Sequence, residues 1–493
     1  MGIKGLLVAL RGHDRRVHVS KFAGRTLAVD VLVWLHQGIV GCATELCTAG
    51  PSSTTRHVKY CMDRVELLIR YGVVPLVVFD GASLPSKDGT DAQRAASRAR
   101  AMAAGNALLA AGQREAARMQ FVKAVDVTPD IQHDLMLALR KRGVSFLVAP
   151  YEADAQLAFL CASGIADGVI TEDSDTLPYR CSTVLFKMER DGSATAIERT
   201  PSAAFFRRHK CESGGKVDTI SLAGFKDASF LDMCVLAGCD YCPSLPGIGL
   251  KNAWRLVRDR GGLQGAIRQL RADGALFGSD SYPADALRAK QTFVYQRVWD
   301  PVAGRCVTLR PPEAAAEWGV EPPDLACPAA SAFLGPHREP DVATAIARGI
   351  IHPETLRPYP GEDLAQVPRA LLPAPPDTRC GTPNAAPTPG SGPFTLLKPQ
   401  VVGSALVTSR PSGLQAKITG AFRPASTTAS SYFGSATSRT PVPNAPPSLP
   451  SPLGRRRAQR GATALPALYG VKATAGAAPV GLLALSGTCA GEP

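Results

Sequence analysis

The feature that most constrains the fold of this 493-residue chain is a recurring unit in which a short apolar run leads to an acidic residue. RTLAVD and VVPLVVFD end at Asp30 and Asp80, VSFLVAP leads into YEADAQLAFLCA, and DGVITEDSD ends at Asp173 and Asp175. Short runs rich in Val, Leu and Ile, separated by segments of helical character, predict an α/β fold with a mainly parallel sheet covered on both faces. Ligands of such sheets bind beyond the carboxyl ends of the strands, where these acids lie.

The spacing of the acids bears on whether they can share one site. At the end of an extended strand, Asp173 and Asp175 project to the same side because they are two residues apart. Glu152 and Asp154 have the same spacing, but in a regular helix they would point in different directions. They can meet only if the helix is just beginning there, which Pro150 favours. We therefore expect folding to bring acids from separate segments together.

Carboxylates gathered in this way repel one another unless cations lie between them. Oxygen ligands in this number suit Mg²⁺ or Mn²⁺, and two such ions roughly 3.5 to 4 Å apart can activate water and stabilise the leaving oxygen of a phosphodiester. The alternative is that each acid caps a helix or forms a turn, which are common roles of single aspartates. For the set as a whole we favour the metal site.

Two further stretches carry chemistry that is ambiguous when each is taken alone. The alanine-rich segment 91–125 favours helix, and Arg94 and Arg98 would share one face of it, which is also typical of a solvated basic surface. PSLPGIGLKNAWRLV places a G-x-G turn, Gly247 and Gly249, before an amphipathic helix. Small residues let backbone approach a phosphate, and a helix N-terminus supplies N–H donors, but a simple turn between helices is the more common explanation.

Taken in order, seven segments resemble the 5′ nuclease superfamily, which includes flap endonuclease and the excision-repair nuclease: MGIKGLL, AVDVLVWLH, VVFDG, LPSK, APYEADAQLAFL, TEDSD and AGCDYCPSLPGIGLKNA. YEADAQLAFL with TEDSDTLPY is most similar to the exonuclease 1 branch. The resemblance covers roughly residues 1 to 355 and implies a PIN-like 5′ nuclease fold. Its expected parts are an N-terminal nuclease region (1–100), a continuation of a helical arch (101–130), and an internal nuclease region (131–355) with a helix-two-turn-helix near 234–270.

The resemblance also implies roles for individual residues. Metal ligation, direct or through water, is implied for Asp30, Asp80, Glu152, Asp154, Asp173, Asp175 and Asp240. Lys87 and Arg94 match positions that contact the scissile phosphate and stabilise charge developing on it. DNA contacts are implied at His36, Arg98, Gly247, Gly249 and Lys251. The implied ions are two Mg²⁺, for which Mn²⁺ can substitute, and a K⁺ bound by backbone oxygens at the helix-two-turn-helix.

The sequence departs from the family pattern at two places. Leu32 follows Asp30 where relatives often have an aromatic residue that can stack on a base. TLPYR replaces the commoner glycine-containing continuation of TEDSD, a change that we expect to alter a loop more than the chemistry. Every expected carboxylate is present, which argues against an inactive nuclease.

Composition separates the last quarter of the chain from the rest. Residues 361–493 carry 20 of the 41 prolines and contribute +8 of the net charge of +13. Ser-, Thr-, Ala-, Gly- and Pro-rich stretches cannot bury enough apolar surface to offset chain entropy, so we expect a disordered basic tail over 356–493. The basic balance favours a polyanionic partner such as DNA.

The tail carries two short motifs. QAKITGAF resembles a sliding-clamp-binding box, with Gln415, Ile418 and Phe422 in place, although Ala421 stands where one of two aromatics is usual. GRRRAQR is typical of a nuclear import signal or of a solvated basic run. Scattered cysteines and the lack of a signal peptide or long apolar run favour a soluble intracellular protein, and we expect a nuclear one. A lone C-x-x-C at Cys239 and Cys242 lacks the second pair that a structural zinc site needs.

The sequence thus predicts a metal-dependent 5′ to 3′ exonuclease on duplex DNA with 5′ flap endonuclease activity. We expect it to act in DNA repair, including mismatch repair and end resection, and in recombination. The expected partners are duplex DNA with 5′ ends, nicks or flaps, and a sliding clamp and mismatch-repair proteins bound through the tail. The alternatives are a flap endonuclease proper, a related RNase, and a noncatalytic scaffold that binds DNA ends.

Overall fold

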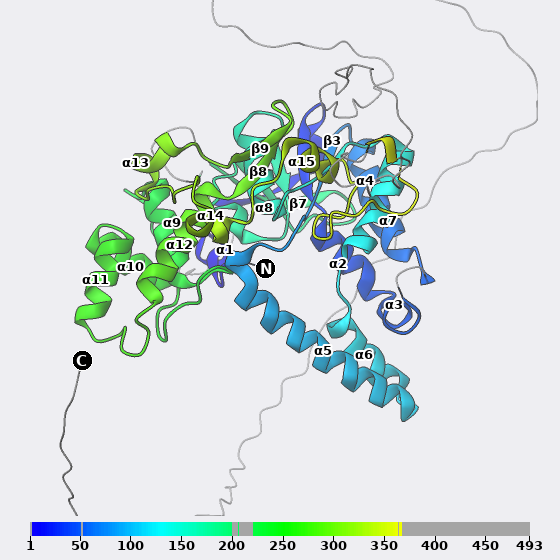
Figure 1. Cartoon of the computed structure of the whole chain (residues 1–493), viewed down its shortest axis with the longest axis horizontal. Coiled ribbons are helices and arrows are strands. Elements are labelled where there is room, and N and C mark those ends of the chain that lie inside the picture. The colour runs from blue at the N-terminus through cyan, green and yellow to red at the C-terminus, as the bar shows by residue number, and fades with distance from the viewer. Residues whose placement is uncertain (1, 51–52, 200–205, 207–219, 363, 367–493) are drawn as a thin grey trace, which may run out of the picture. The chain divides into compact units, whose positions relative to one another are not determined.

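The computed structural model describes residues 2–50, 53–199, 206, 220–362 and 364–366, which all belong to one folding unit (Figure 1). Gln415, Ile418, Phe422 and the arginine-rich run that follows them lie outside the described residues.

A seven-stranded sheet forms the centre of this unit (Figure 1). Its strand order is β1-β7-β6-β5-β2-β3-β4. Strands β6, β5, β2, β3 and β4 run parallel, whereas β7 pairs antiparallel with both β6 and β1. The prediction of a mainly parallel sheet is therefore confirmed, with an antiparallel edge added. The strands are β1 (Asp14–His18), β2 (Thr26–Asp30), β3 (Val74–Phe79), β4 (Phe146–Val148), β5 (Gly168–Ile170), β6 (Thr183–Phe186) and β7 (Ser193–Glu198).

The strand order reverses between β2 and β5. From β2 the chain adds β3 and then β4 on one side, after which β5 pairs with the other side of β2, with Val29 opposite Ile170. A reversal of this kind opens a crevice at the carboxyl ends of the two strands, because the connections leave in opposite directions. Asp30 ends β2, and the segment with Asp173 and Asp175 follows β5.

Successive residues of the central strands face two different cores. Val29 and Val77 pack with α2 (Leu32–Val40), α4 (Arg56–Arg70), α7 (Pro129–Arg142) and α15 (Pro340–Ala347). Ala28 and Leu76 pack with α1 (Leu6–Ala9), α8 (Ala153–Ala162), α9 (Asp227–Ala237) and α12 (Tyr282–Tyr295). Both faces of the sheet are thus buried, which explains why its strands are almost continuously apolar.

A helical hairpin stands between β3 and β4 in the chain and extends away from the sheet (Figure 1). The alanine-rich segment is two helices, α5 (Asp88–Ala110) and α6 (Arg114–Ala124), because Gly112 turns the chain with φ 76°. A Cβ atom on Gly105 would lie only 2.7 Å from the ring of Phe121. The absence of a side chain at Gly105 therefore lets the two helices approach closely.

The region predicted as a helix-two-turn-helix consists of α9 and α10 (Leu250–Arg260), joined by residues 238–249. The remaining elements are α3 (Ala43–Ala49), α11 (Leu263–Ala272), α13 (Ala315–Trp318) and α14 (Pro328–Ser331), the β8 (Arg297–Asp300) and β9 (Arg305–Thr308) hairpin, and 3₁₀ turns η1 (Val19–Phe22), η3 (Pro85–Lys87), η4 (Ser174–Thr176), η5 (Pro312–Ala314), η6 (Ala332–Leu334) and η7 (Leu364–Gln366). No helix within the described ranges is long and apolar enough to cross a membrane.

The folded part continues past the boundary expected at residue 355. Tyr359 is buried and stacks on His133 with ring centroids 4.0 Å apart. The Glu362 carboxylate accepts a hydrogen bond of 2.6 Å from Arg140. This stretch contains prolines, as the tail does. The buried Tyr359 ring and the ion pair of Glu362 with Arg140 nevertheless hold the stretch against α7.

Candidate active site

Seven acidic residues reach the crevice from five segments. Asp30 is the last residue of β2, Asp80 follows β3, and Asp240 follows α9. Glu152 precedes α8 with extended backbone, φ −82° and ψ 141°, and Asp154 lies in the first turn of that helix. The helix therefore begins where the spacing of these two acids requires.

Asp173 and Asp175 meet through a tight turn and not through an extended strand. β5 already ends at Ile170, and Asp173 precedes the 3₁₀ turn η4, with its Oδ1 accepting a hydrogen bond of 2.9 Å from the Asp175 N–H. The Asp175 Oδ1 accepts one of 2.9 Å from the Ile3 N–H. A Cβ atom on Gly2, whose φ is 80°, would overlap carboxylate oxygens of both aspartates, so glycine is needed there. The two carboxylates therefore face the same site because of this turn, and not because of the extended strand that the sequence predicted.

Burial and mutual repulsion disfavour the charged forms of these acids. Burial and then the Asp80 charge raise the pKa of Asp30 to about 7, and burial raises that of Asp80 to about 6. Burial and then Asp173 raise the pKa values of Asp154 and Asp175 well above the usual range. Such shifts are expected of carboxylates gathered without cations. The cluster therefore favours binding of positive charge.

Two basic side chains at the start of the hairpin contact the outer acids. Lys87 forms ion pairs with Glu152 and with Asp240, the latter at 2.9 Å. Arg94 pairs with Asp240 at 3.0 Å. Although burial opposes both shifts, Glu152 and Asp240 raise the pKa of Lys87, and Lys87 and Arg94 lower the pKa of Asp240. Lys87 therefore supplies a tethered positive charge at one side of the cluster.

Many carboxylate oxygens of the cluster accept hydrogen bonds from the chain itself. Asp30 accepts from Thr171 Oγ1 at 2.7 Å and from the Leu32 N–H at 3.1 Å. Asp80 accepts from the Ala153 N–H at 2.8 Å, but its Oδ2, although buried, has no hydrogen-bond partner among the described residues.

Within the same ranges, no three His, Cys, Asp or Glu side chains are arranged so that they could hold a metal ion. The donor set is nevertheless entirely oxygen, with an unsatisfied buried carboxylate oxygen and raised carboxyl pKa values, and this chemistry fits Mg²⁺. Metal ligation by the seven acids stays a prediction.

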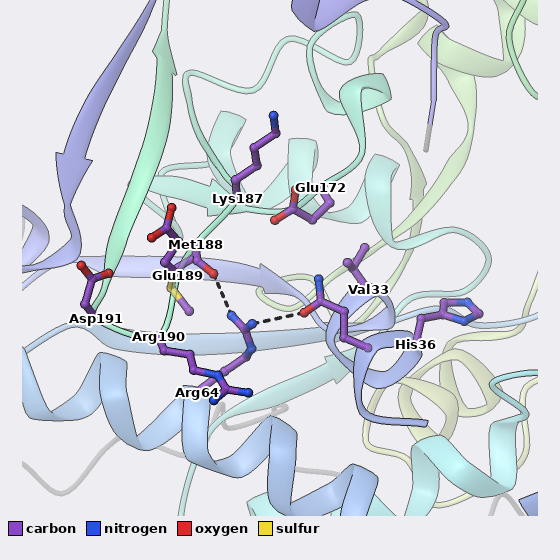
Figure 2. Close-up of a pocket in the computed structure, with 10 residues that line it drawn as sticks. Val33, His36, Arg64, Glu172, Lys187, Met188, Glu189, Arg190 and Asp191 are labelled. Atoms are coloured by element: carbon purple, nitrogen blue, oxygen red, sulfur yellow. Dashed lines mark hydrogen bonds between the residues drawn. The ribbon is translucent and has the colours of Figure 1, made fainter. Parts of the chain in front are cut away.

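His36 lines a neighbouring pocket of about 870 Å³, shown in Figure 2. Glu172, which immediately precedes Asp173, lies on the same wall as Lys187, and Arg64 donates hydrogen bonds to the Met188 carbonyl at 2.8 Å and to Gln37 Oε1 at 3.2 Å. Burial lowers the pKa of His36. The remaining lining residues are Val33, Glu189, Arg190 and Asp191.

The other predicted DNA-binding residues lie on two other elements. Arg98 of α5 pairs with Asp126 at 2.9 Å. Gly247 has φ 78°, and Gly249 precedes α10; a Cβ atom on either would meet nothing within 4 Å. Lys251 is exposed in the first turn of α10. The hairpin and α10 therefore present these residues separately from the acid cluster, and their DNA contacts stay predictions.

Thr171 and Tyr241, which contact the acids, and Tyr179, which contacts Tyr241, were not singled out from the sequence. Thr171 donates to Asp30, and Tyr241 donates a hydrogen bond to Glu152 and is hydrogen-bonded to Tyr179 at 2.6 Å. All three lie within the quoted motifs, one, two or four residues from an acid. Spacing alone does not show where their hydroxyl groups point.

The two departures from the family pattern have structural counterparts. Leu32 begins α2, and its N–H donates to Asp30. Arg180, in the segment that replaces the usual glycine-containing one, has φ 73°, a left-handed conformation that favours glycine. Ion pairs with Asp227 at 3.0 Å and with Glu317 accompany this conformation.

The chain is similar to known proteins over most of its length. The XPG N-terminal domain matches residues 1–101, and the XPG I-region matches residues 143–240. Exonuclease 1 of Oryza sativa subsp. japonica is 39% identical over 363 residues, which are 73% of this chain and 40% of that protein. Exonuclease 1 of Arabidopsis thaliana is 38% identical over 364 residues, 74% of this chain and 46% of that protein. The chain thus spans less than half the length of these curated relatives.

A shorter relative is matched over most of its length. The DNA damage-inducible protein DIN7 of Saccharomyces cerevisiae is 30% identical over 309 residues, which are 63% of this chain and 69% of that protein. Among solved structures, the catalytic core of Rad2 in complex with DNA substrate has a TM-score of 0.40 and 22% identity, and covers 57% of this chain and 75% of that chain.

Proposed function

Because the chain belongs to the exonuclease 1 branch of the XPG-type 5′ nucleases, we propose that it is a Mg²⁺-dependent 5′ to 3′ exonuclease on duplex DNA with 5′ flap endonuclease activity. The observation that carries the proposal is the gathering of seven carboxylates at the reversal between β2 and β5, with Lys87 and Arg94 at its edge. Mutually repelling oxygen ligands beside two cations suit the hydrolysis of a phosphodiester.

Each group of residues has a task in this proposal. The seven acids hold Mg²⁺, which when bound supplies an activated water and neutralises charge on the phosphodiester. Thr171 and the Leu32 N–H orient Asp30, and the Ile3 N–H orients Asp175. When DNA binds, Lys87 and Arg94 give up their ion pairs with Asp240 and contact the scissile phosphate instead. The Arg94 side chain is 41% exposed, so this change of partner costs it little desolvation.

Duplex DNA is the proposed partner, and three elements support this. Gly247, Gly249 and Lys251 place small residues, backbone N–H groups and a cation at the start of α10, where backbone oxygens of the preceding turn would hold K⁺. Arg98 adds a cation on α5, and His36 contributes from the pocket in Figure 2. We propose a nuclear role in DNA repair and recombination, with a sliding clamp and mismatch-repair proteins as further partners.

The test is digestion of DNA labelled at a 5′ end, with a recessed 5′ strand, a nick and a 5′ flap as parallel substrates, by the wild-type chain and by Asp173→Ala in Mg²⁺. We expect mononucleotides from the recessed and nicked duplexes, and a loss of more than about a hundredfold in rate in the variant. Asp63→Ala, which removes an exposed carboxylate on α4 that pairs with Lys59 and belongs neither to the cluster nor to the pocket, is the control and should cleave normally.

Three rival functions predict different results in this experiment or in its repetition with an RNA strand. A flap endonuclease proper would favour the flap over the recessed end. A noncatalytic scaffold that binds DNA ends would leave all three substrates intact although the wild-type chain is well folded. An RNase of related fold would prefer an RNA strand in the same duplex.

A further inference from the structure

Glu152, which pairs with Lys87, also accepts a hydrogen bond that has no part in the proposed chemistry. Its Oε1 pairs with Lys87, and its Oε2 accepts a hydrogen bond from the hydroxyl of Tyr241. The Tyr241 hydroxyl is hydrogen-bonded at 2.6 Å to that of Tyr179, which in turn is 2.6 Å from Gln296 Oε1. Three polar side chains thus connect Glu152 to the interior of the protein.

The scaffold around this chain of hydrogen bonds is buried and held at several points. Tyr179 is 1% exposed and Gln296 is fully buried. Both tyrosine rings pack against Phe293, with centroids 4.7 Å and 5.0 Å away. The Tyr179 carbonyl accepts a hydrogen bond of 3.0 Å from Arg310. The rings therefore keep their positions, and the hydroxyl groups have little freedom except in the direction of their protons.

Proton counting gives these hydrogen bonds a direction. A tyrosine hydroxyl has one proton, so if Tyr241 donates to Glu152, it must accept from Tyr179. Tyr179 then has no proton left for Gln296, and the Gln296 amide must donate. Its Nε2 is a buried atom without a hydrogen-bond partner among the described residues, and a half-turn of the amide places it against Tyr179. In this arrangement every donor points toward the Glu152 carboxylate.

We infer that Tyr241 and Tyr179 are positioning residues that fix the Glu152 carboxylate through this chain of hydrogen bonds. Tyr241 holds Oε2, which leaves Oε1 on the side of Lys87 and Asp240. A buried hydroxyl lowers stability unless it is satisfied, so a phenylalanine at position 179 would fill the same space more simply if packing were its whole role. The inference rests on the proposed function, because it assigns these residues to the metal site.

The test uses the full chain and four variants: Tyr241→Phe, Tyr179→Phe, the double variant, and Tyr295→Phe. Tyr295 is the matched control, because it is equally buried and its hydroxyl donates at 2.9 Å to the Val320 carbonyl, away from the acids. Mg²⁺ affinity is measured without DNA by titration calorimetry. Single-turnover cleavage of the recessed duplex gives the rate and the KM for DNA separately.

Loss of an outer hydrogen bond to a metal ligand commonly weakens metal affinity about 10- to 100-fold. We expect Tyr241→Phe to weaken Mg²⁺ affinity about tenfold and to slow cleavage with KM unchanged. Tyr179→Phe should weaken affinity about threefold, and the double variant should match Tyr241→Phe alone, because Tyr179 acts through Tyr241. Tyr295→Phe should lower stability without changing Mg²⁺ affinity.

Three outcomes would overturn the inference or the function beneath it. If Tyr179→Phe matches Tyr295→Phe, or its effect is undiminished in the Tyr241→Phe background, the positioning role is wrong while the proposed function stands. If the wild-type chain binds Mg²⁺ but cleaves nothing, the proposed function fails and the affinities still decide the positioning role. If the wild-type chain binds no Mg²⁺, both are wrong.

Discussion

At the scale of single residues, Lys87 has two opposing effects on the acid cluster. Its ammonium neutralises Glu152 and Asp240 while its side chain is only 19% exposed, so in the absence of Mg²⁺ it stabilises charges that would otherwise repel. The same ion pairs must compete with a metal that uses these acids. Under the proposed function, a residue that assists cleavage would therefore also weaken binding of the metal that cleavage requires.

Lys87→Ala should separate these effects. We expect tighter Mg²⁺ binding, by roughly three- to tenfold, because one competing cation is gone. The cleavage rate should fall about 10²- to 10³-fold through loss of a donor to the scissile phosphate. Calorimetry and single-turnover kinetics measure the two quantities.

Lys59→Ala serves as the control for Lys87→Ala. Lys59 pairs with Asp63 at 3.1 Å on the surface, where the two side chains are 76% and 65% exposed. Neither affinity nor rate should change. If Lys87→Ala binds Mg²⁺ more weakly than the wild-type chain does, Lys87 does not compete with Mg²⁺ for the acids.

The raised pKa values of Asp30, about 7, and Asp80, about 6, predict how Mg²⁺ binding depends on pH. The folded state favours the protonated forms of these acids, so their ionisation lowers the stability of the metal-free protein. The metal-free protein has this stability in full below about pH 4, loses it as the pH rises, and has lost it above about pH 7. Mg²⁺ must displace protons from Asp30 and Asp80 at pH 6 but not at pH 8. Its apparent affinity should therefore fall about tenfold between pH 8 and pH 6.

Calorimetry in two buffers with different ionisation enthalpies counts the protons released when Mg²⁺ binds. Release should be greater at pH 6.5, where Asp30 and Asp80 together contribute about one proton per protein, than at pH 8, where their contribution is near zero. Binding that releases no protons at pH 6.5 would mean that Asp30 and Asp80 are already ionised there.

At the scale of elements, the sequence predicts the strands that carry the acids more readily than those at the antiparallel edge. β2 and β3 lie in continuous apolar runs because both of their faces are buried. β1, with the sequence DRRVH, buries only Val17 fully, and its partner β7 lies about 180 residues away in the chain. Neither composition nor local periodicity indicates such a pairing.

The acids of the cluster also differ in how readily the sequence predicts them. Asp30 and Asp80 could be found from strand ends, whereas Asp240 follows a helix and was assigned only through the resemblance. Tyr179 and Tyr241 could not be found, because the partner of a buried hydroxyl depends on how α8, η4 and α12 pack together.

The helical hairpin yields a prediction about close packing. Gly105→Leu should force the fully buried Phe121 ring aside and lower the free energy of unfolding of the hairpin by about 1–3 kcal/mol. Hydrogen exchange should accelerate over 88–124 and stay unchanged in β2 and β3.

Gly89→Ala is the control for the hairpin variant, because a Cβ atom there meets nothing within 4 Å. It should stabilise α5 by up to about 1 kcal/mol, as expected for glycine to alanine in a helix. Unchanged exchange in Gly105→Leu would show that the hairpin does not depend on this contact.

At the scale of the whole molecule, the chain returns after α15 to close the fold on α7. Tyr359→Ala should lower the free energy of unfolding by about 3 kcal/mol, since it removes a buried ring that stacks on His133. Denaturant unfolding of the full chain measures this change. Thr355→Ala, at a nearby exposed position, should change stability by less than about 0.5 kcal/mol. If the two variants are equally stable, Tyr359 does not contribute to the fold, and the folded region ends at residue 355 as the sequence predicted.

The reversal of strand order between β2 and β5 also bears on when, during synthesis, the proposed nuclease activity can begin. Asp30 is synthesised early, whereas Asp175 and Asp240 follow β5 and α9 in the chain. A chain that has emerged from the ribosome only as far as β5 still lacks Asp173, Asp175 and Asp240. Under the proposed function, cleavage therefore requires folding of the chain at least as far as the segment that follows α9.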